Sequence, residues 1–175
     1  MKLSRPELVQ RLTGIRLLTL DVDGVLTDGG LYYADDGSQL RKFNVKDGLG
    51  IKRAQSAGVV VALVTASHTP SILHRAKALG IEHVRLGIEE KATAVEDLCR
   101  KCAILASDVA HMGDDLNDLP VFGMVGLALT VADAVTPVRE AADYVSVLGG
   151  GQGAVREICD LIVGAREMVD GGTVA

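Results

Sequence analysis

The sequence lacks several features that mark common classes of function. It has no tryptophan, and aromatic residues make up only 3% of it, which argues against a surface that stacks nucleic-acid bases. A net charge of −5 also argues against broad nucleic-acid binding. It does not exclude a phosphorylated small molecule as substrate, because a metal ion and a few cationic side chains can offset the charge at the binding site. No apolar run is long enough to span a membrane, and Met1-Lys2-Leu3-Ser4 does not begin a secretion signal. We therefore expect a soluble, cytoplasmic protein with neither a membrane nor a nucleic-acid partner.

Cysteine is also scarce. Cys99 and Cys102 have a spacing that occurs in redox and zinc sites, but Cys159 is the only other cysteine. Because a structural zinc ion needs four ligands, we interpret all three as ordinary reduced thiols.

The chain is organised around an apolar run that stops at two acids. Leu17 to Leu20 is followed by Asp21-Val22-Asp23-Gly24, which predicts a buried strand with carboxylates at its carboxyl end. Two carboxylates this close repel each other, and a bound cation with oxygen ligands relieves the repulsion. Mg²⁺ is the common choice. A plain solvated turn is the alternative, since Asp and Gly both favour turns.

Strand and helix patterns alternate along nearly the whole chain, with no repeat or linker. This alternation predicts an α/β fold, a parallel sheet flanked by helices, in a single domain over residues 1–175. Two β-prone segments around Asp36-Gly37 predict a hairpin at about residues 30–45. The predicted strands lie near residues 15–20, 59–64, 82–86, 109–112, 125–129 and 144–147. The predicted helices lie near residues 4–11, 48–57 with Asp47 as cap, 70–79, 89–101, 116–122, 133–141 and 154–168.

Polar residues gather where several predicted strands end, and they suit phosphoryl transfer. In a parallel sheet these ends share one crevice. Asp21 is the candidate nucleophile, forming an aspartyl-phosphate, and Asp23 the candidate acid and base. Asp114, the Asp21 carboxylate and the Asp23 backbone carbonyl are the candidate Mg²⁺ ligands. Thr65 and Lys91 are the candidate ligands of the phosphoryl oxygens.

Further candidates have plainer alternatives. Asp115 either supports the metal site or caps the next helix, and Asn117 either positions a loop or touches phosphate. The glycine-rich segment 149–153 reads as a flexible loop, and Arg156 beside it is a candidate for binding an anion. Lys91 taken alone could be a solvated helix lysine, and the histidines read as structural.

Together these motifs resemble the haloacid dehalogenase-like phosphatase superfamily, in order and spacing. The segments 43–48, 131–134 and 150–157 are similar to those of the 3-deoxy-D-manno-octulosonate 8-phosphate (KDO 8-phosphate) phosphatases. This resemblance implies a Rossmann-like fold and a Mg²⁺-dependent, cytoplasmic homotetramer. It also implies that the substrate is a sugar-acid phosphate, an intermediate of the lipopolysaccharide inner core.

One position departs from that family. Close relatives usually have Gly-Arg after the second-motif threonine, where this chain has Ala66-Ser67. Ala66 is itself a candidate for binding the substrate or its phosphate. Nine-carbon sugar-acid 9-phosphates are therefore an alternative substrate class. A phospho-acceptor receiver domain and a non-catalytic subunit that keeps a relic site are alternatives of other classes.

The spacing of the motifs leaves no room for an inserted cap domain. The segments from Asp23 to Thr65 and from Thr65 to Asp114 are filled by the hairpin and by alternating helices and strands. Since a phosphatase must limit water around its substrate, we expect a neighbouring subunit to cover the site. The hairpin, and the 149–153 loop with Arg156, are the candidate contacts.

Overall fold

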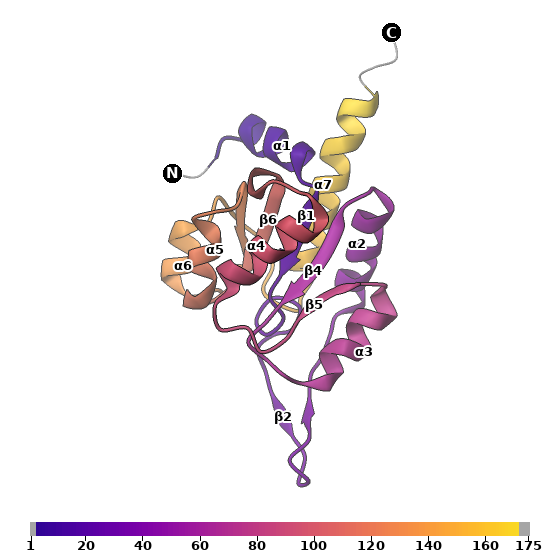
Figure 1. Ribbon diagram of the computed structural model, residues 1–175, viewed down its shortest axis with the longest axis vertical. Coiled ribbons are helices and arrows are strands. Elements are labelled where there is room, and N and C mark those ends of the chain that lie inside the picture. Colours follow the sequence, from indigo (N-terminus) through magenta and orange to yellow (C-terminus); the bar gives the residue numbers. More distant parts are fainter. Residues whose placement is uncertain (1–2, 172–175) are drawn as a thin grey trace.

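The computed structural model describes residues 3–171, and a six-stranded sheet forms its centre (Figure 1). Every neighbouring pair of strands is parallel, in the order β5-β4-β1-β6-β7-β8. The predicted parallel α/β fold is therefore confirmed. The strands are β1 (Leu17–Leu20), β4 (Val60–Val64), β5 (His83–Arg85), β6 (Val109–Gly113), β7 (Leu127–Thr130) and β8 (Tyr144–Val145).

Helices cover both faces of the sheet, and the strand side chains alternate between two cores. Leu18 and Leu20 belong to the larger core, while Leu17 belongs to the smaller one. Such strands are mostly apolar because neither face meets water, although Thr19, His111 and Thr130 are buried polar residues on them. The larger core receives side chains from α1 (Arg5–Gly14), α2 (Val45–Ser56), α3 (Pro70–Leu79), α6 (Thr136–Ala141) and α7 (Ala154–Gly171). The smaller core is closed by α4 (Lys91–Cys102) and α5 (Leu119–Phe122).

A two-stranded hairpin projects from the body of the molecule (Figure 1). It consists of β2 (Tyr32–Tyr33) and β3 (Gln39–Leu40), paired antiparallel. Gly37 makes the tight turn between them with a φ of +81°, which glycine adopts without strain. The predicted hairpin is thus present, and in the described residues no cap domain interrupts the fold.

Several helix ends differ from the sequence-based expectation. The capping box of Ser4 and Glu7 is present, with the Ser4 amide donating to Glu7 at 2.9 Å. Asp47, however, does not cap α2: the cap is Asn44, whose side chain accepts from the Lys46 amide. Helix α6 begins at Thr136 rather than at Asp133, whose carboxylate instead accepts from the Gly150 amide at 2.9 Å.

No helix within residues 3–171 is both long and apolar enough to cross a membrane. Cys99 and Cys159 are buried free thiols, and Cys102 is a half-buried one.

Candidate active site

Three neighbouring strands bring predicted site residues to one edge of the sheet. β1 lies between β4 and β6, so Asp21 at the end of β1 stands between Thr65, after β4, and Asp114, after β6. After β1 the chain continues to β4 on one side of it, and after β5 it returns to β6 on the other side. Such a switch in strand order opens a crevice at the carboxyl ends of the strands. Asp21 and Thr65 are both buried there.

Lys91 carries its charge into this crevice. It is the first residue of α4, and its side chain is fully buried between two carboxylates. Its Nζ lies 3.0 Å from Asp21 Oδ2 and 2.7 Å from Asp118 Oδ1. Burial alone would lower the pKa of Lys91, but Asp21 and Asp118 raise it, so the ammonium stays charged. The structure therefore places Lys91 in the site and not on a solvated helix face.

Asp118 is a site residue that the sequence interpretation missed. Besides Lys91, its carboxylate is bonded to His111 Nε2 at 2.9 Å and accepts from the Asp114 and Asp115 amides. Burial raises the pKa of Asp118, but His111 and Lys91 outweigh burial and hold it below its usual range. The short 3₁₀ helix η2 (Leu116–Asp118) folds the acid back onto those amides. The spacing of Asp114 and Asp118, four residues apart across such a turn, was the available signal.

Gly113 is required by this arrangement. A Cβ atom on residue 113 would lie 2.1 Å from Asp118 Cγ, closer than any real contact. Gly113 thus leaves room for the Asp118 carboxylate to reach the Asp114 and Asp115 amides.

Carboxylate oxygens of Asp21, Asp114 and Asp118 lie within 4.8 Å of one another. Oxygen-rich clusters of this kind suit Mg²⁺. Asp118 is the poorer ligand of the three, because Lys91, His111 and two amides already engage it. Asp114 Oδ1 is buried without a hydrogen-bond partner, which fits a metal ligand. Burial, with the charges of Asp21 and Asp118, raises the pKa of Asp114 to about 8.

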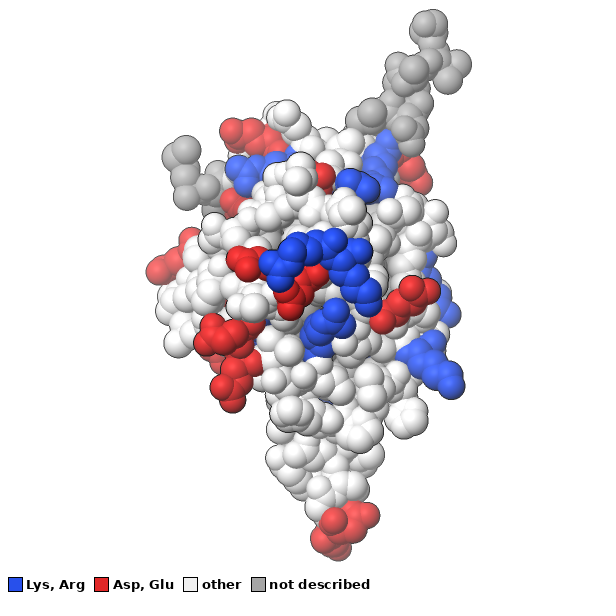
Figure 2. Space-filling view, viewed as in Figure 1, with Lys and Arg blue, Asp and Glu red and all other residues white. Residues whose placement is uncertain are grey.

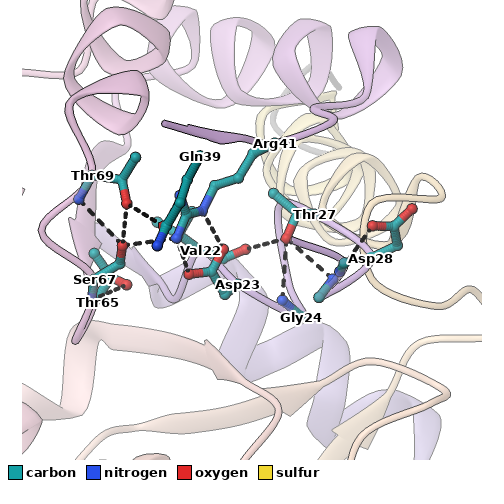
Figure 3. A network of polar contacts seen from close by, with 12 residues as sticks. Val22, Asp23, Gly24, Thr27, Asp28, Gln39, Arg41, Thr65, Ser67 and Thr69 are labelled. Carbon is teal, nitrogen blue, oxygen red and sulfur yellow. Dashed lines mark hydrogen bonds and ion pairs between the residues drawn. The ribbon is translucent and has the colours of Figure 1, made fainter. Parts of the chain in front are cut away.

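The Asp23 carboxylate is not part of this cluster but faces the hairpin (Figure 3). Arg41, which follows β3, donates from Nε to Asp23 Oδ1 at 2.6 Å and from Nη2 to Asp23 Oδ2 at 3.0 Å. The same Nη2 lies 2.9 Å from Ser67 Oγ. Sequence interpretation missed Arg41, because nothing local marks a hairpin arginine as the partner of an acid 18 residues earlier.

The segment 149–153 proves to be a fixed support and not a flexible loop. The Gly151 amide donates to the Val25 carbonyl at 3.0 Å, and the Asn44 side chain donates to the Gly151 carbonyl at 2.9 Å. A Cβ atom on Gly150 would lie 1.9 Å from the Gly24 carbonyl oxygen. This segment therefore braces the turn that follows Asp23 in its own chain.

A cleft of about 670 Å³ opens between the hairpin and the loop after β4. Ala66 lies in its wall, next to Ser67. Most of the lining side chains are small or polar: Ser38, Gln39, Ser67, His68, Thr69 and Ser71.

Three predicted candidates lie outside the buried cluster. Asp115 is exposed and accepts from the Leu116 amide as the cap of η2, which is the second of its two predicted roles. Asn117 is exposed as well. The Arg156 side chain pairs with Asp160 at 2.7 Å along α7 and packs against Gly50 of α2.

Sequence comparisons agree with this geometry. Residues 87–153 match the model of the haloacid dehalogenase-like hydrolases. The 3-deoxy-D-manno-octulosonate 8-phosphate phosphatase of Salmonella typhimurium is 44% identical over 94% of this chain and 88% of its own length. The enzyme of the same name from Escherichia coli strain K12 is also 44% identical, over 94% of this chain and 87% of its own.

Solved structures agree as well. The phosphatase of the same name from Yersinia pestis has a TM-score of 0.91 and 41% identity, covering 94% of this chain and 89% of that one. The Moraxella catarrhalis phosphatase, solved with magnesium, phosphate and KDO, has a TM-score of 0.92 and 36% identity, covering 97% of both chains. The chain therefore belongs to the 3-deoxy-D-manno-octulosonate 8-phosphate phosphatase family of haloacid dehalogenase-like hydrolases.

Proposed function

We propose that this chain is a Mg²⁺-dependent phosphatase that hydrolyses KDO 8-phosphate to KDO and phosphate. The observation that carries the proposal is the buried Asp21, held 3.0 Å from Lys91 and beside the unpartnered oxygen of Asp114. A nucleophile, a fixed cation and an oxygen cluster for a metal are what phosphoryl transfer requires. The membership of the chain in this phosphatase family supports the choice of substrate.

The first step transfers the phosphoryl group to the protein. An oxygen of Asp21 attacks phosphorus, the bond from phosphorus to the sugar oxygen breaks, and Asp23 donates a proton to that oxygen. In the second step Asp23 takes a proton from water, and the water oxygen attacks the aspartyl-phosphate. Phosphate leaves, and the Asp21 carboxylate is restored.

The other residues hold the phosphoryl group. Lys91, the Thr65 hydroxyl and the Ala66 amide bind its oxygens, and the network around Asp118 keeps Lys91 charged and fixed. Mg²⁺, when bound by Asp21, Asp114 and the Asp23 backbone carbonyl, neutralises charge on the phosphoryl group. Asp115, exposed as a cap, supports that site only through the backbone of η2.

Phosphate release from a panel of substrates tests this function. The panel holds KDO 8-phosphate, a nine-carbon sugar-acid 9-phosphate and a hexose phosphate, and we expect the first to have the highest kcat/KM. Asp21→Asn removes the nucleophile and should lower kcat by roughly 10³-fold or more. Asp115→Asn, a matched change at an exposed acid, should leave kcat unchanged. An aspartyl-phosphate that persists after treatment with acetyl phosphate would instead identify a receiver-like domain.

We also propose that the protein is one catalytic domain that works in the cytoplasm as a homotetramer, in lipopolysaccharide synthesis. The cleft lacks a cap in the described residues, so a neighbouring subunit is the simplest cover. Tyr32, Tyr33 and Leu40 of the hairpin are exposed apolar residues. Figure 2 shows a hairpin that carries little charge along its length, with acids at its tip. These features suit contact with another copy.

Mass in solution tests the assembly. The native protein should have four times the mass of the chain, and Leu40→Glu should lower that mass and the turnover together. Leu105→Glu, at a leucine of the main body that is more exposed than Leu40, should change neither. A monomer that keeps full turnover at high dilution would exclude a subunit that covers the site.

A further inference from the structure

His111 is a completely buried polar side chain beside the charges of the candidate active site. It lies in β6, opposite Thr19 of β1. Because side chains alternate along a strand, it points to the same face as Val109, the face that α4 and α5 cover. There the ring packs edge-on against Phe122, with 6.0 Å between the ring centroids. The two chemical steps proposed above do not involve this side chain.

Both ring nitrogens of His111 have a partner, which fixes the direction of the ring. Nδ1 lies 2.8 Å from Thr19 Oγ1, and Nε2 lies 2.9 Å from Asp118 Oδ1. Since a carboxylate only accepts hydrogen bonds, the hydrogen on Nε2 points at Asp118. A buried polar ring that is satisfied at both nitrogens has little freedom to turn. His111 therefore presents a fixed donor to Asp118.

Hydrogen bonds occupy both oxygens of Asp118. Oδ2 accepts from the Asp114 and Asp115 amides at 3.0 and 3.2 Å. Oδ1 accepts from His111 Nε2 at 2.9 Å and from Lys91 Nζ at 2.7 Å. A carboxylate has about four acceptor positions, so these donors leave no free position for a metal ion. The amides hold one oxygen and His111 holds the other, so the place of Oδ1 is set by groups other than Lys91.

The place of Asp118 Oδ1 matters because Lys91 is shared between two acids. Its Nζ lies 2.7 Å from Asp118 Oδ1 and 3.0 Å from Oδ2 of Asp21, the proposed nucleophile. An ammonium has three N–H donors, so one remains for a phosphoryl oxygen. If Asp118 Oδ1 moved away, the attraction of Asp21 would draw the ammonium onto the nucleophile. A fixed Asp118 thus keeps Lys91 available for the phosphoryl group.

We propose that His111 is a positioning residue for phosphoryl transfer. It holds Asp118 Oδ1, and Asp118 in turn holds Lys91 with one N–H free for the phosphoryl group. This inference rests on the proposed function. His111 touches neither the substrate nor the reacting atoms, so its loss should weaken contacts with phosphate and leave contacts with the sugar unchanged.

The test compares two amides at this position, His111→Gln and His111→Asn. Glutamine brings its amide nitrogen to the place of Nε2, whereas asparagine reaches only the place of Nδ1. On KDO 8-phosphate, His111→Asn should lower kcat by about 10- to 100-fold, the loss of one hydrogen bond to a charged group. It should also weaken inhibition by inorganic phosphate but not by free KDO. His111→Gln should lose much less in each measurement.

Two controls separate positioning from a general effect on the fold. The two amide variants should melt at similar temperatures, so that the difference between them reports on Asp118. His83→Asn changes a histidine that is only half-buried and lies 3.6 Å from Cys102 Sγ, and it should leave kcat unchanged. In an Asp118→Asn background, His111→Asn should cause no further loss of kcat, because the residue through which it acts is already changed.

Different failures separate this inference from the proposed function. If the native protein hydrolyses KDO 8-phosphate and the two amide variants lose equal activity, this inference is wrong and the proposed function stands. Additive losses in the Asp118→Asn background, or equal weakening of inhibition by phosphate and by KDO, also overturn it. If the native protein hydrolyses no sugar-acid phosphate, the proposed function fails, and this inference fails with it.

Discussion

At the residue scale, Asp118 holds the buried charges of the site in place, although it does not stand at a strand end. Asp118 contacts Lys91, His111 and the two amides that follow β6. Through Lys91 it also fixes the cation beside Asp21, the proposed nucleophile. The strand-end positions predict Asp21, whereas the position of the cation beside it depends on Asp118, five residues beyond Gly113, the last residue of β6.

Replacing Asp118 should cost more than replacing its exposed neighbour. Asp118→Asn keeps the shape but leaves Lys91 with a single buried anion, and breaking such a network should lower the free energy of unfolding by about 3 kcal/mol. Asp115→Asn should change it by less than about 0.5 kcal/mol, because asparagine caps a helix as well as aspartate does. Urea denaturation in the absence of metal measures both. Equal effects would show that the charge on Asp118 is not structural.

At the scale of elements, the first turn of α7 is held by residues far away in sequence. Asp47 lies within α2, yet its Oδ1 accepts from the Arg156 amide at 2.8 Å. It therefore satisfies a free amide at the start of α7. Burial raises the pKa of Asp47, while hydrogen bonds from the Arg156 and Gly153 amides lower it. Asp47, predicted to cap its own helix, thus caps α7 instead, and it holds the 149–153 segment against the turn that follows Asp23.

That segment should tolerate no side chain at Gly150. Gly150→Ala would place a Cβ atom 1.9 Å from the Gly24 carbonyl oxygen, so the turn after Asp23 must shift. We expect a lower melting temperature and a loss of turnover of roughly 10²-fold, typical of a misplaced catalytic group. Gly164→Ala is the control, since nothing lies within 4 Å of a Cβ there. In the interior of α7 it should stabilise the protein by about 1 kcal/mol. Full turnover in Gly150→Ala would contradict a bracing role.

At the scale of the whole molecule, the sheet brings the carboxylates of Asp21 and Asp114 together at the carboxyl ends of its strands, and this lowers the stability of the fold. Burial raises the pKa values of both Asp21 and Asp114, despite the attraction of Lys91. A carboxyl with a raised pKa holds its proton in the folded state over a range in which the unfolded chain has lost it. Stability then falls as pH rises. The metal-free protein is therefore least stable at the pH values at which both carboxyl groups are ionised.

We accordingly expect the metal-free protein to lose stability between about pH 4 and the pKa of Asp114 at about 8. The limit for one proton is about 1.4 kcal/mol per pH unit, and partial exposure of Asp114 makes the real slope smaller. Mg²⁺ binds the ionised form, so it should raise the melting temperature more at pH 8 than at pH 6. Thermal melts with EDTA and with Mg²⁺ measure this difference. Asp114→Asn should reduce the dependence of stability on pH. A metal-free stability that rises over this pH range would contradict the raised pKa of Asp114.

The sequence by itself determined the parallel α/β fold, the hairpin and the positions of Asp21, Asp23 and Asp114. These follow from local patterns: apolar runs form buried strands, and the carboxyl ends of parallel strands meet at one edge. Lys91 was predicted as a phosphoryl ligand only from the motifs around it, and its buried position depends on Asp118.

Only the tertiary structure decided which side chains meet across the chain. Arg41 reaches Asp23 from the hairpin, Asp47 caps a helix 109 residues away, and Arg156 pairs along its own helix. The 149–153 segment, which has the composition of a flexible loop, is held in place by Val25, Asn44 and the close approach of Gly24. Composition and periodicity describe how a segment folds locally. Contacts between distant segments depend on how the elements pack, and here that packing decides what holds the acid Asp23.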